Sequence, residues 1–318
     1  MNWLYIVIAA YALNAIAITI DKFLLTKSIP QPAAYTFNVA MLNGIVTLLL
    51  LPLGFELLSP FNAFIGLFAG VAFTLALYFM YNSLKLDEAS RVIPYIGSLN
   101  PFFIFFLAIL FLNEKLAGKE IIAFLLILSG SILISWRFRD KKNIFQHLIP
   151  KRISAALHED KKREAIKVFG IATVSALLFA ISYTLTKHIY NSTSFLNGFV
   201  WTRFGVLFGI LLILIPKENR ATIVLGKNKP GKKTGGIFLF GQACGGLSFF
   251  LINYSFSLNS VTLVHALQGI QYIILFLIII FLSKKFPRIL EEKLTPILLT
   301  QKISAIFLIV FGLYFLVV

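Results

Sequence analysis

Long apolar stretches recur along this chain, and they constrain its fold more than any other feature. There are ten, bounded by charges, prolines or polar clusters, at residues 3–20, 34–53, 62–83, 91–112, 119–136, 168–189, 195–215, 235–256, 260–283 and 299–318. About 20 helical residues cross the hydrocarbon layer of a bilayer. Hydrophobic residues make up 58% of the chain and charged residues only 13%. The sequence therefore predicts an all-α membrane protein with about ten transmembrane helices.

One long polar segment, residues 137–167, separates the first five stretches from the last five. Offsets of 165, 172 and 182 residues place the first half on the second, and the aligned pairs include Lys22 with Lys187, Leu86 with Leu258 and Gly130 with Gly312. Because five is an odd number, the second copy of such a unit must lie inverted in the membrane. We expect two inverted five-helix repeats, over 1–136 and 168–318, joined by a basic polar loop.

Several motifs of the first half resemble a known family. They run from Tyr81 through Ser83, Leu86, Ala89, Ser90, Pro94 and Pro101 to Phe111-Leu112-Asn113-Glu114-Lys115-Leu116. They are similar to the third and fourth helices of ten-helix transporters of the drug/metabolite transporter superfamily, which are built from two EamA-like units, and residues 123–133 resemble the fifth helix. In the second half, Glu291-Glu292-Lys293-Leu294 echoes the Glu-Lys-Leu motif after an insertion over 284–290. The resemblance implies a central cavity enclosed by both halves, with the last helix of each half outside.

Basic residues gather on one side of the predicted spans. Of the 29 lysines and arginines, 25 follow odd-numbered spans and only three follow even-numbered ones. Since basic loops favour the cytoplasm, this predicts a cytoplasmic 137–167 loop and outward termini, whereas the resembling family generally keeps both termini inside. Residues 152–169 have amphipathic helical spacing and could lie along the membrane surface.

The expected partners follow from the same charges. Basic loops beside anionic lipid account for most of the net charge of +16, so no nucleic-acid partner is needed. We expect an integral, multi-pass protein of the plasma membrane with a small-molecule substrate and membrane lipid as its partners. A homodimer stays open as an assembly.

Arg203 is the strongest candidate for a functional residue. It lies inside the seventh predicted span with no ionisable neighbour within one helical turn. A charge at that depth is unfavourable unless it is used, so we interpret it as an anchor for a carboxylate or phosphate. The alternative is that it pairs with backbone carbonyls or a distant carboxylate, or extends to the interface.

A second group of candidates is polar and uncharged. His265 and Gln268 are three residues apart on one helical face with Tyr272 nearby, and could hydrogen-bond a substrate or join two helices. The candidate substrate-binding residues are Arg203, His265, Gln268, Tyr272, Asn100, Tyr95, Asn14 and Tyr183. All 13 acidic residues fall in loops or near predicted span ends. A neutral or anionic metabolite is therefore favoured over an organic cation.

Neither an enzyme nor a cofactor protein is expected. The chain contains no His-Glu-x-x-His and no Gly-x-Ser-x-Gly motif, and its single cysteine, Cys244, cannot form an internal disulfide. The sequence predicts a secondary transporter that works by alternating access between its halves. A flippase for a lipid-linked substrate, with a cavity open sideways to lipid, an exporter of amino acids or drugs, and a receptor or scaffold stay open as alternatives.

Overall fold

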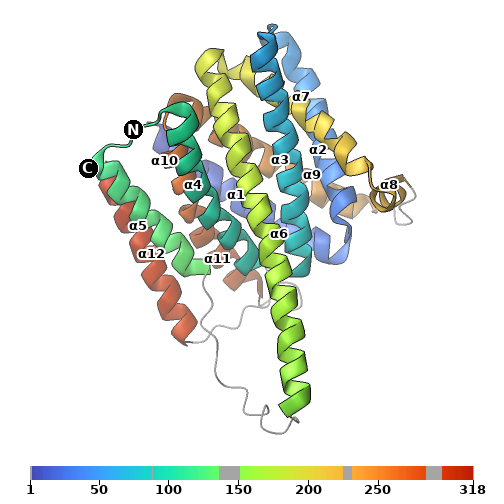
Figure 1. Ribbon diagram of the computed structural model, residues 1–318, viewed down its shortest axis with the longest axis vertical. Coiled ribbons are helices and arrows are strands. Elements are labelled where there is room, and N and C mark those ends of the chain that lie inside the picture. The colour runs from blue at the N-terminus through green and yellow to red at the C-terminus, as the bar shows by residue number, and fades with distance from the viewer. Residues whose placement is uncertain (1, 88, 136–150, 225–230, 284–295, 318) are drawn as a thin grey trace.

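The structure is a computed structural model that describes residues 2–317 apart from 88, 136–150, 225–230 and 284–295. Within those ranges every regular element is a helix, which confirms the predicted fold class (Figure 1). The first half contains α1 (Asn2–Lys27), α2 (Pro32–Leu50), the 3₁₀ turn η1 (Leu51–Leu53), α3 (Pro60–Leu86), α4 (Ala89–Leu112) and α5 (Gly118–Ser135). The second half contains α6 (Lys151–Ser192), α7 (Phe195–Leu214), α8 (Lys217–Val224), α9 (Lys232–Leu258), α10 (Val261–Ala266), α11 (Gly269–Ser283) and α12 (Pro296–Val317).

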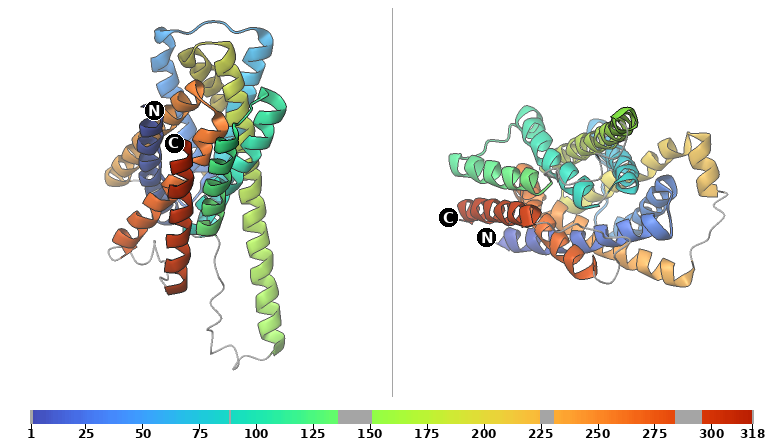
Figure 2. Two further views of the ribbon diagram at one scale, coloured as in Figure 1. Left: turned by 90° about the vertical axis from the view of Figure 1, so that its left-hand side faces the viewer. Right: turned by 90° about the horizontal axis from the view of Figure 1, so that it is seen from below.

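Eight stretches of the described helices are individually long and apolar enough to cross a membrane. They are α1, α2 with η1, α3, α4, most of α6, α7, α9, and α10 together with α11. The remaining two expected spans correspond to α5, which has 18 residues, and α12, whose apolar part is Thr300–Phe315. These two helices lie side by side at the edge of the bundle, as the family resemblance implied (Figures 1 and 2).

Two lysine contacts repeat between the halves. The Lys22 ammonium on α1 donates to the Leu84 carbonyl at 2.7 Å, and the Lys187 ammonium on α6 donates to the Phe256 carbonyl at 2.8 Å. Each lysine thus binds a carbonyl in the last turn of the third span of its own half. The carbonyls of a last turn have no hydrogen-bond donor within their own helix. The two lysines are 165 residues apart and the two carbonyls 172, the offsets found in the sequence.

The contact between α5 and α12 shows that the repeats are inverted. A methyl group on Gly130 would lie 2.7 Å from the Ile309 side chain, and one on Gly312 would lie 2.6 Å from Ile127. The contact therefore runs forward along α5 and backward along α12, so the two helices are antiparallel. The last helices of the two halves accordingly point in opposite directions, as expected of an inverted repeat.

Two predicted boundaries differ from the structure. Residues 152–169 are not a separate helix but the first part of α6, which runs without interruption from Lys151 to Ser192. The ninth predicted span is broken at Leu267 and Gln268, where bonds from Gln268, Ile270 and Gln271 amides reach back three residues rather than four. The polar loop proper, and the Glu-Glu-Lys-Leu motif at 291–294, lie outside the described residues.

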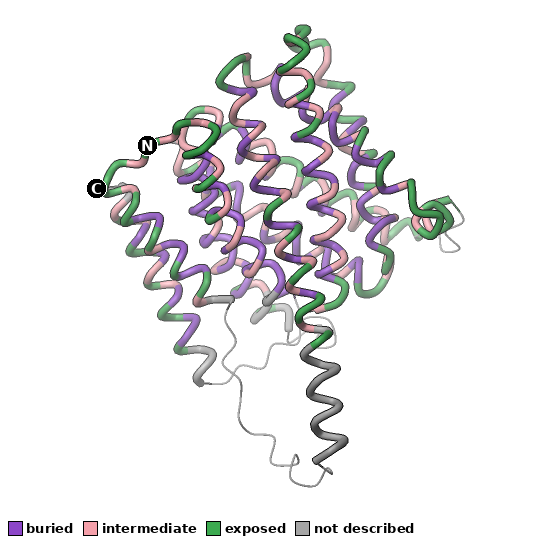
Figure 3. Tube along the Cα trace, viewed as in Figure 1, coloured by how far each residue is buried: buried purple, intermediate pink, exposed green. Residues whose placement is uncertain are grey.

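The surface of the bundle is apolar where it would meet lipid. Buried and exposed residues alternate along the helices (Figure 3), and many of the exposed residues are large and apolar. Leu49, Leu110 and Phe281 are 71%, 72% and 75% exposed. Such exposure is unfavourable in water and favourable in hydrocarbon, which fits a membrane-spanning bundle.

Candidate functional site

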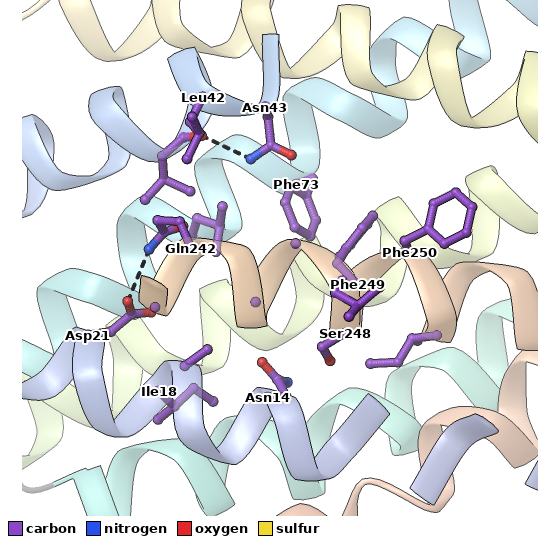
Figure 4. A pocket seen from close by; sticks show the side chains of 18 of the residues that line it. Asn14, Ile18, Asp21, Leu42, Asn43, Phe73, Gln242, Ser248, Phe249 and Phe250 are labelled. Atoms are coloured by element: carbon purple, nitrogen blue, oxygen red, sulfur yellow. Dashed lines mark hydrogen bonds between the residues drawn. The ribbon is translucent and has the colours of Figure 1, made fainter. Parts of the chain in front are cut away.

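A cavity of about 630 Å³ lies at the centre of the bundle. It is lined by residues of α1, α2, α3 and α4 from the first half and of α6, α7 and α9 from the second, with Gln268 from the turn before α11. Figure 4 shows α9 side chains, including Gln242 and Phe249, facing those of α1 and α2. The volume lies within the range of sites that hold small organic molecules.

Arg203 contributes the positive charge of this cavity. It is only 3% exposed, and its guanidinium carbon lies 4.2 Å from the centre of the Phe249 ring and 4.8 Å from that of Phe73. Its Nη1 donates to Asn43 Oδ1 at 3.4 Å, and its Nε has no hydrogen-bond partner. Aromatic faces stabilise a cation but accept no strong hydrogen bond, so the guanidinium keeps donor capacity for a ligand.

Unpartnered polar atoms also gather around the break between α10 and α11. His265 Nε2, Gln268 Oε1, Tyr272 Oη and Asn100 Oδ1 are buried without a hydrogen-bond partner. Buried polar groups normally find partners, so a cluster of four without them marks a place where water or a ligand can bind. Broken helices of this kind form substrate and ion sites in secondary transporters.

A buried carboxylate reaches the cavity from α1. Tyr35 of α2, Tyr81 of α3 and Gln242 of α9 donate to Asp21 at 2.6, 3.3 and 3.2 Å. Asp21 is only 5% exposed. Because its three donors come from α2, α3 and α9, this one buried group on α1 connects four helices from both halves. The donors surround both carboxylate oxygens, so much of their accepting capacity is used within the protein.

Asp21 was expected near the end of the first predicted span, and in the structure it lies inside α1 and is buried in the bundle. The predicted first span ended at residue 20 because Asp21 and Lys22 follow it, but α1 continues to Lys27. Both charges are paired inside the bundle, Asp21 with three side-chain donors and Lys22 with backbone carbonyls. No sequence signal identified these partners, because they come from other helices.

Five of the eight candidate residues line the cavity: Arg203, Gln268, Asn100, Asn14 and Tyr183. His265 lies behind the cavity wall with its ring 4.1 Å from that of Tyr183, and Tyr272 is buried in α11. Tyr95 lies 3.0 Å from the Thr173 hydroxyl, between α4 and α6, and does not line the cavity.

A helical membrane bundle with two inverted halves around a central cavity has the architecture of a transporter. Residues 1–136 match the sequence model of the EamA-like transporter family, so this part of the chain is an EamA-like unit of the drug/metabolite transporter superfamily. Members of that family are transporters rather than enzymes. No curated protein matches the chain.

The fold extends over the whole chain in a solved structure. That structure, titled "Crystal structure of protein", is 15% identical, and the match covers 96% of each chain with a TM-score of 0.59. At this identity the likeness concerns the fold alone. The EamA-like match over residues 1–136 indicates a membrane transporter, and the substrate must be inferred from the cavity.

Proposed function

We propose that this protein is a secondary transporter that moves a small organic solute, neutral or anionic, by alternating access between its two halves. The solute occupies the central cavity, and Arg203 binds its anionic or hydrogen-bond-accepting group. The observation that carries the proposal is the buried Arg203 Nε without a partner, on a guanidinium held between aromatic rings.

The position of acidic residues in loops or near span ends was an argument against cationic substrates. Asp21 weakens that argument, since its carboxylate faces the cavity. Its oxygens, however, accept from Tyr35, Tyr81 and Gln242, whereas Arg203 retains a free donor. A ligand gains more from the group whose capacity is unused. This difference supports an anion over a cation.

The direction of the chain in the membrane follows from the charge bias. We propose that residues 137–167 face the cytoplasm and that the protein resides in the plasma membrane. Protease cleavage within this segment in sealed inside-out vesicles, and its protection in right-side-out vesicles, would support the proposed orientation. The reverse pattern would contradict it.

A thermal-shift screen of the purified protein tests the proposed substrate class. Amino acids, sugars, nucleotides, organic acids, phosphorylated metabolites and quaternary amines are compared, because a ligand of the native state raises its melting temperature. We expect an anion to raise it in the wild type and in Arg220→Gln, which changes an exposed arginine of α8, but not in Arg203→Gln. A shift with quaternary amines alone, or one that persists in Arg203→Gln, would refute the anchor.

A further inference from the structure

Two helix pairs that the repeat makes equivalent differ in this structure. The first pair is α3 with α7, the third span of one half and the second span of the other. A methyl group on Gly70 would lie 2.0 Å from the Thr202 carbonyl, and one on Gly205 would lie 2.1 Å from the Leu67 carbonyl. The two backbones therefore touch, and no space remains between these helices at that level.

The equivalent pair, α9 with α2, is separated by the cavity. Val46 of α2 and Leu239 and Leu247 of α9 all line it, and these helices do not pack along their length. They approach each other through the Tyr35 and Phe238 rings, whose centres are 5.5 Å apart. Near the same position Asp21 accepts from both Tyr35 and Gln242, so a polar contact bridges one end of the gap.

The rim of this gap faces the surroundings of the bundle. Val46, Leu239 and Leu247 are 46%, 55% and 52% exposed although they also line the cavity. They lie within helices that span the bilayer, where exposed apolar side chains contact acyl chains. The cavity wall is thus continuous with the lipid-facing surface between α2 and α9.

The interior combines an apolar wall with one unused cationic donor. Leu42, Leu77, Phe73 and Phe249 contribute apolar surface, and Arg203 lies among the rings. An apolar chain on a ligand would replace its lipid contacts with contacts to this wall, and an anionic group would find the guanidinium. A fully polar solute would leave much of the wall without complementary contacts.

We propose that the substrate is an amphipathic organic anion that enters the cavity sideways from the bilayer, between α2 and α9, with its charged group at Arg203. This rests on the proposed transport function and names the substrate class and the route. It also favours, among the alternatives, a carrier of lipid-like molecules.

Two glycines of α9 provide a matched pair of variants. A methyl group on Gly246 or on Gly236 would meet no atom within 4 Å, and both residues are exposed. Gly246 lines the cavity at the gap, whereas Gly236 does not line it. Gly246→Trp therefore places an indole at the opening from a position where its Cβ meets no other atom, and Gly236→Trp adds the same ring elsewhere on the same helix.

The experiment measures the melting temperature of the full chain in lipid nanodiscs with decanoate, hexanoate and decyltrimethylammonium. We expect decanoate to stabilise the wild type and Gly236→Trp, hexanoate to act more weakly, and decyltrimethylammonium to have no effect. Arg203→Gln should require about tenfold more decanoate or lose the shift, since losing a hydrogen bond to a charged group has roughly that effect. Gly246→Trp should weaken or abolish the shift for a different reason, because its indole obstructs the opening.

Other outcomes separate the route from the function. If short anions stabilise the protein through Arg203 and Gly246→Trp binds them like the wild type, the sideways route is wrong and the proposed function stands. If decyltrimethylammonium matches decanoate, the anionic class is wrong. Absence of any shift with decanoate overturns the proposed substrate class, whatever the broader solute screen finds.

Discussion

The α3–α7 contact and the α2–α9 gap are built from equivalent helices, yet one is closed and the other open. Glycines bring the backbones of α3 and α7 together, whereas α2 and α9 line a cavity, to which α9 contributes glycines as well as large apolar side chains. Two copies of one unit therefore occupy two different conformations within one chain. An exchange of these conformations between the halves would move the opening from one pair to the other, which is the basis of alternating access in inverted repeats.

The largest expected effect concerns the closed pair. Gly205→Val places its Cβ against the Leu67 carbonyl, so the backbones must separate, which we expect to destabilise the protein by about 3 kcal/mol or more. Gly246→Val is the matched control, because its Cβ points into open space. Melting temperatures in detergent measure both, and equal values would show that the α3–α7 contact is not tight.

A smaller effect is expected at the closed end of the open pair. Asp21→Asn weakens the hydrogen bonds that join α1, α2, α3 and α9, and should destabilise the protein by about 2 kcal/mol. Glu218→Gln, an exposed acidic residue of α8, is the control and should change stability little. Equal melting temperatures of Asp21→Asn and the wild type would mean that the carboxylate does not hold these helices together.

The lysine contacts test how far the two halves remain alike. Lys22→Met and Lys187→Met each remove a donor from the end of the third span of one half, and we expect a loss of about 1 kcal/mol from each. Melting temperatures of the two variants and of the double variant provide the comparison. A large loss from one and none from the other would show that the repeat is preserved in geometry but not in energetics.

The smallest difference is expected between two tyrosines that share Asp21. Tyr35 donates at 2.6 Å and Tyr81 at 3.3 Å, so Tyr35→Phe should destabilise the protein by about 1 kcal/mol and Tyr81→Phe by less. The order of the two melting temperatures checks this. The reverse order would place the stronger contact on α3 and weaken the account of how α2 is held.

The sequence predicted those parts of the fold that depend on local pattern. Apolar length marked the ten spans, and repeated residues such as Lys22 and Lys187 revealed two copies, because each copy preserves its own internal contacts. Arg203 was found in the same way, since a charge inside an apolar run is visible without a structure.

Other features depend on helices that are distant in sequence. The burial of Asp21 requires donors from α2, α3 and α9, and no local pattern announces them. The break at Gln268 occurs without a proline, whereas α4 contains Pro94 and Pro101 and is one helix. The gap between α2 and α9 is a matter of tertiary placement, so hydropathy could not reveal it.

The central claim is that the two equivalent helix pairs exchange open and closed states. Distances between spin labels test this claim most directly. Labels are placed on Val46 and Leu247 across the gap, and on Phe68 and Phe208 across the closed pair, all of them exposed positions, in a background where the buried Cys244 is replaced by serine. We predict two populations in lipid, in which a shorter Val46–Leu247 distance accompanies a longer Phe68–Phe208 distance, and a bound substrate shifts their ratio. Fixed distances for both pairs, with and without substrate, would contradict the account.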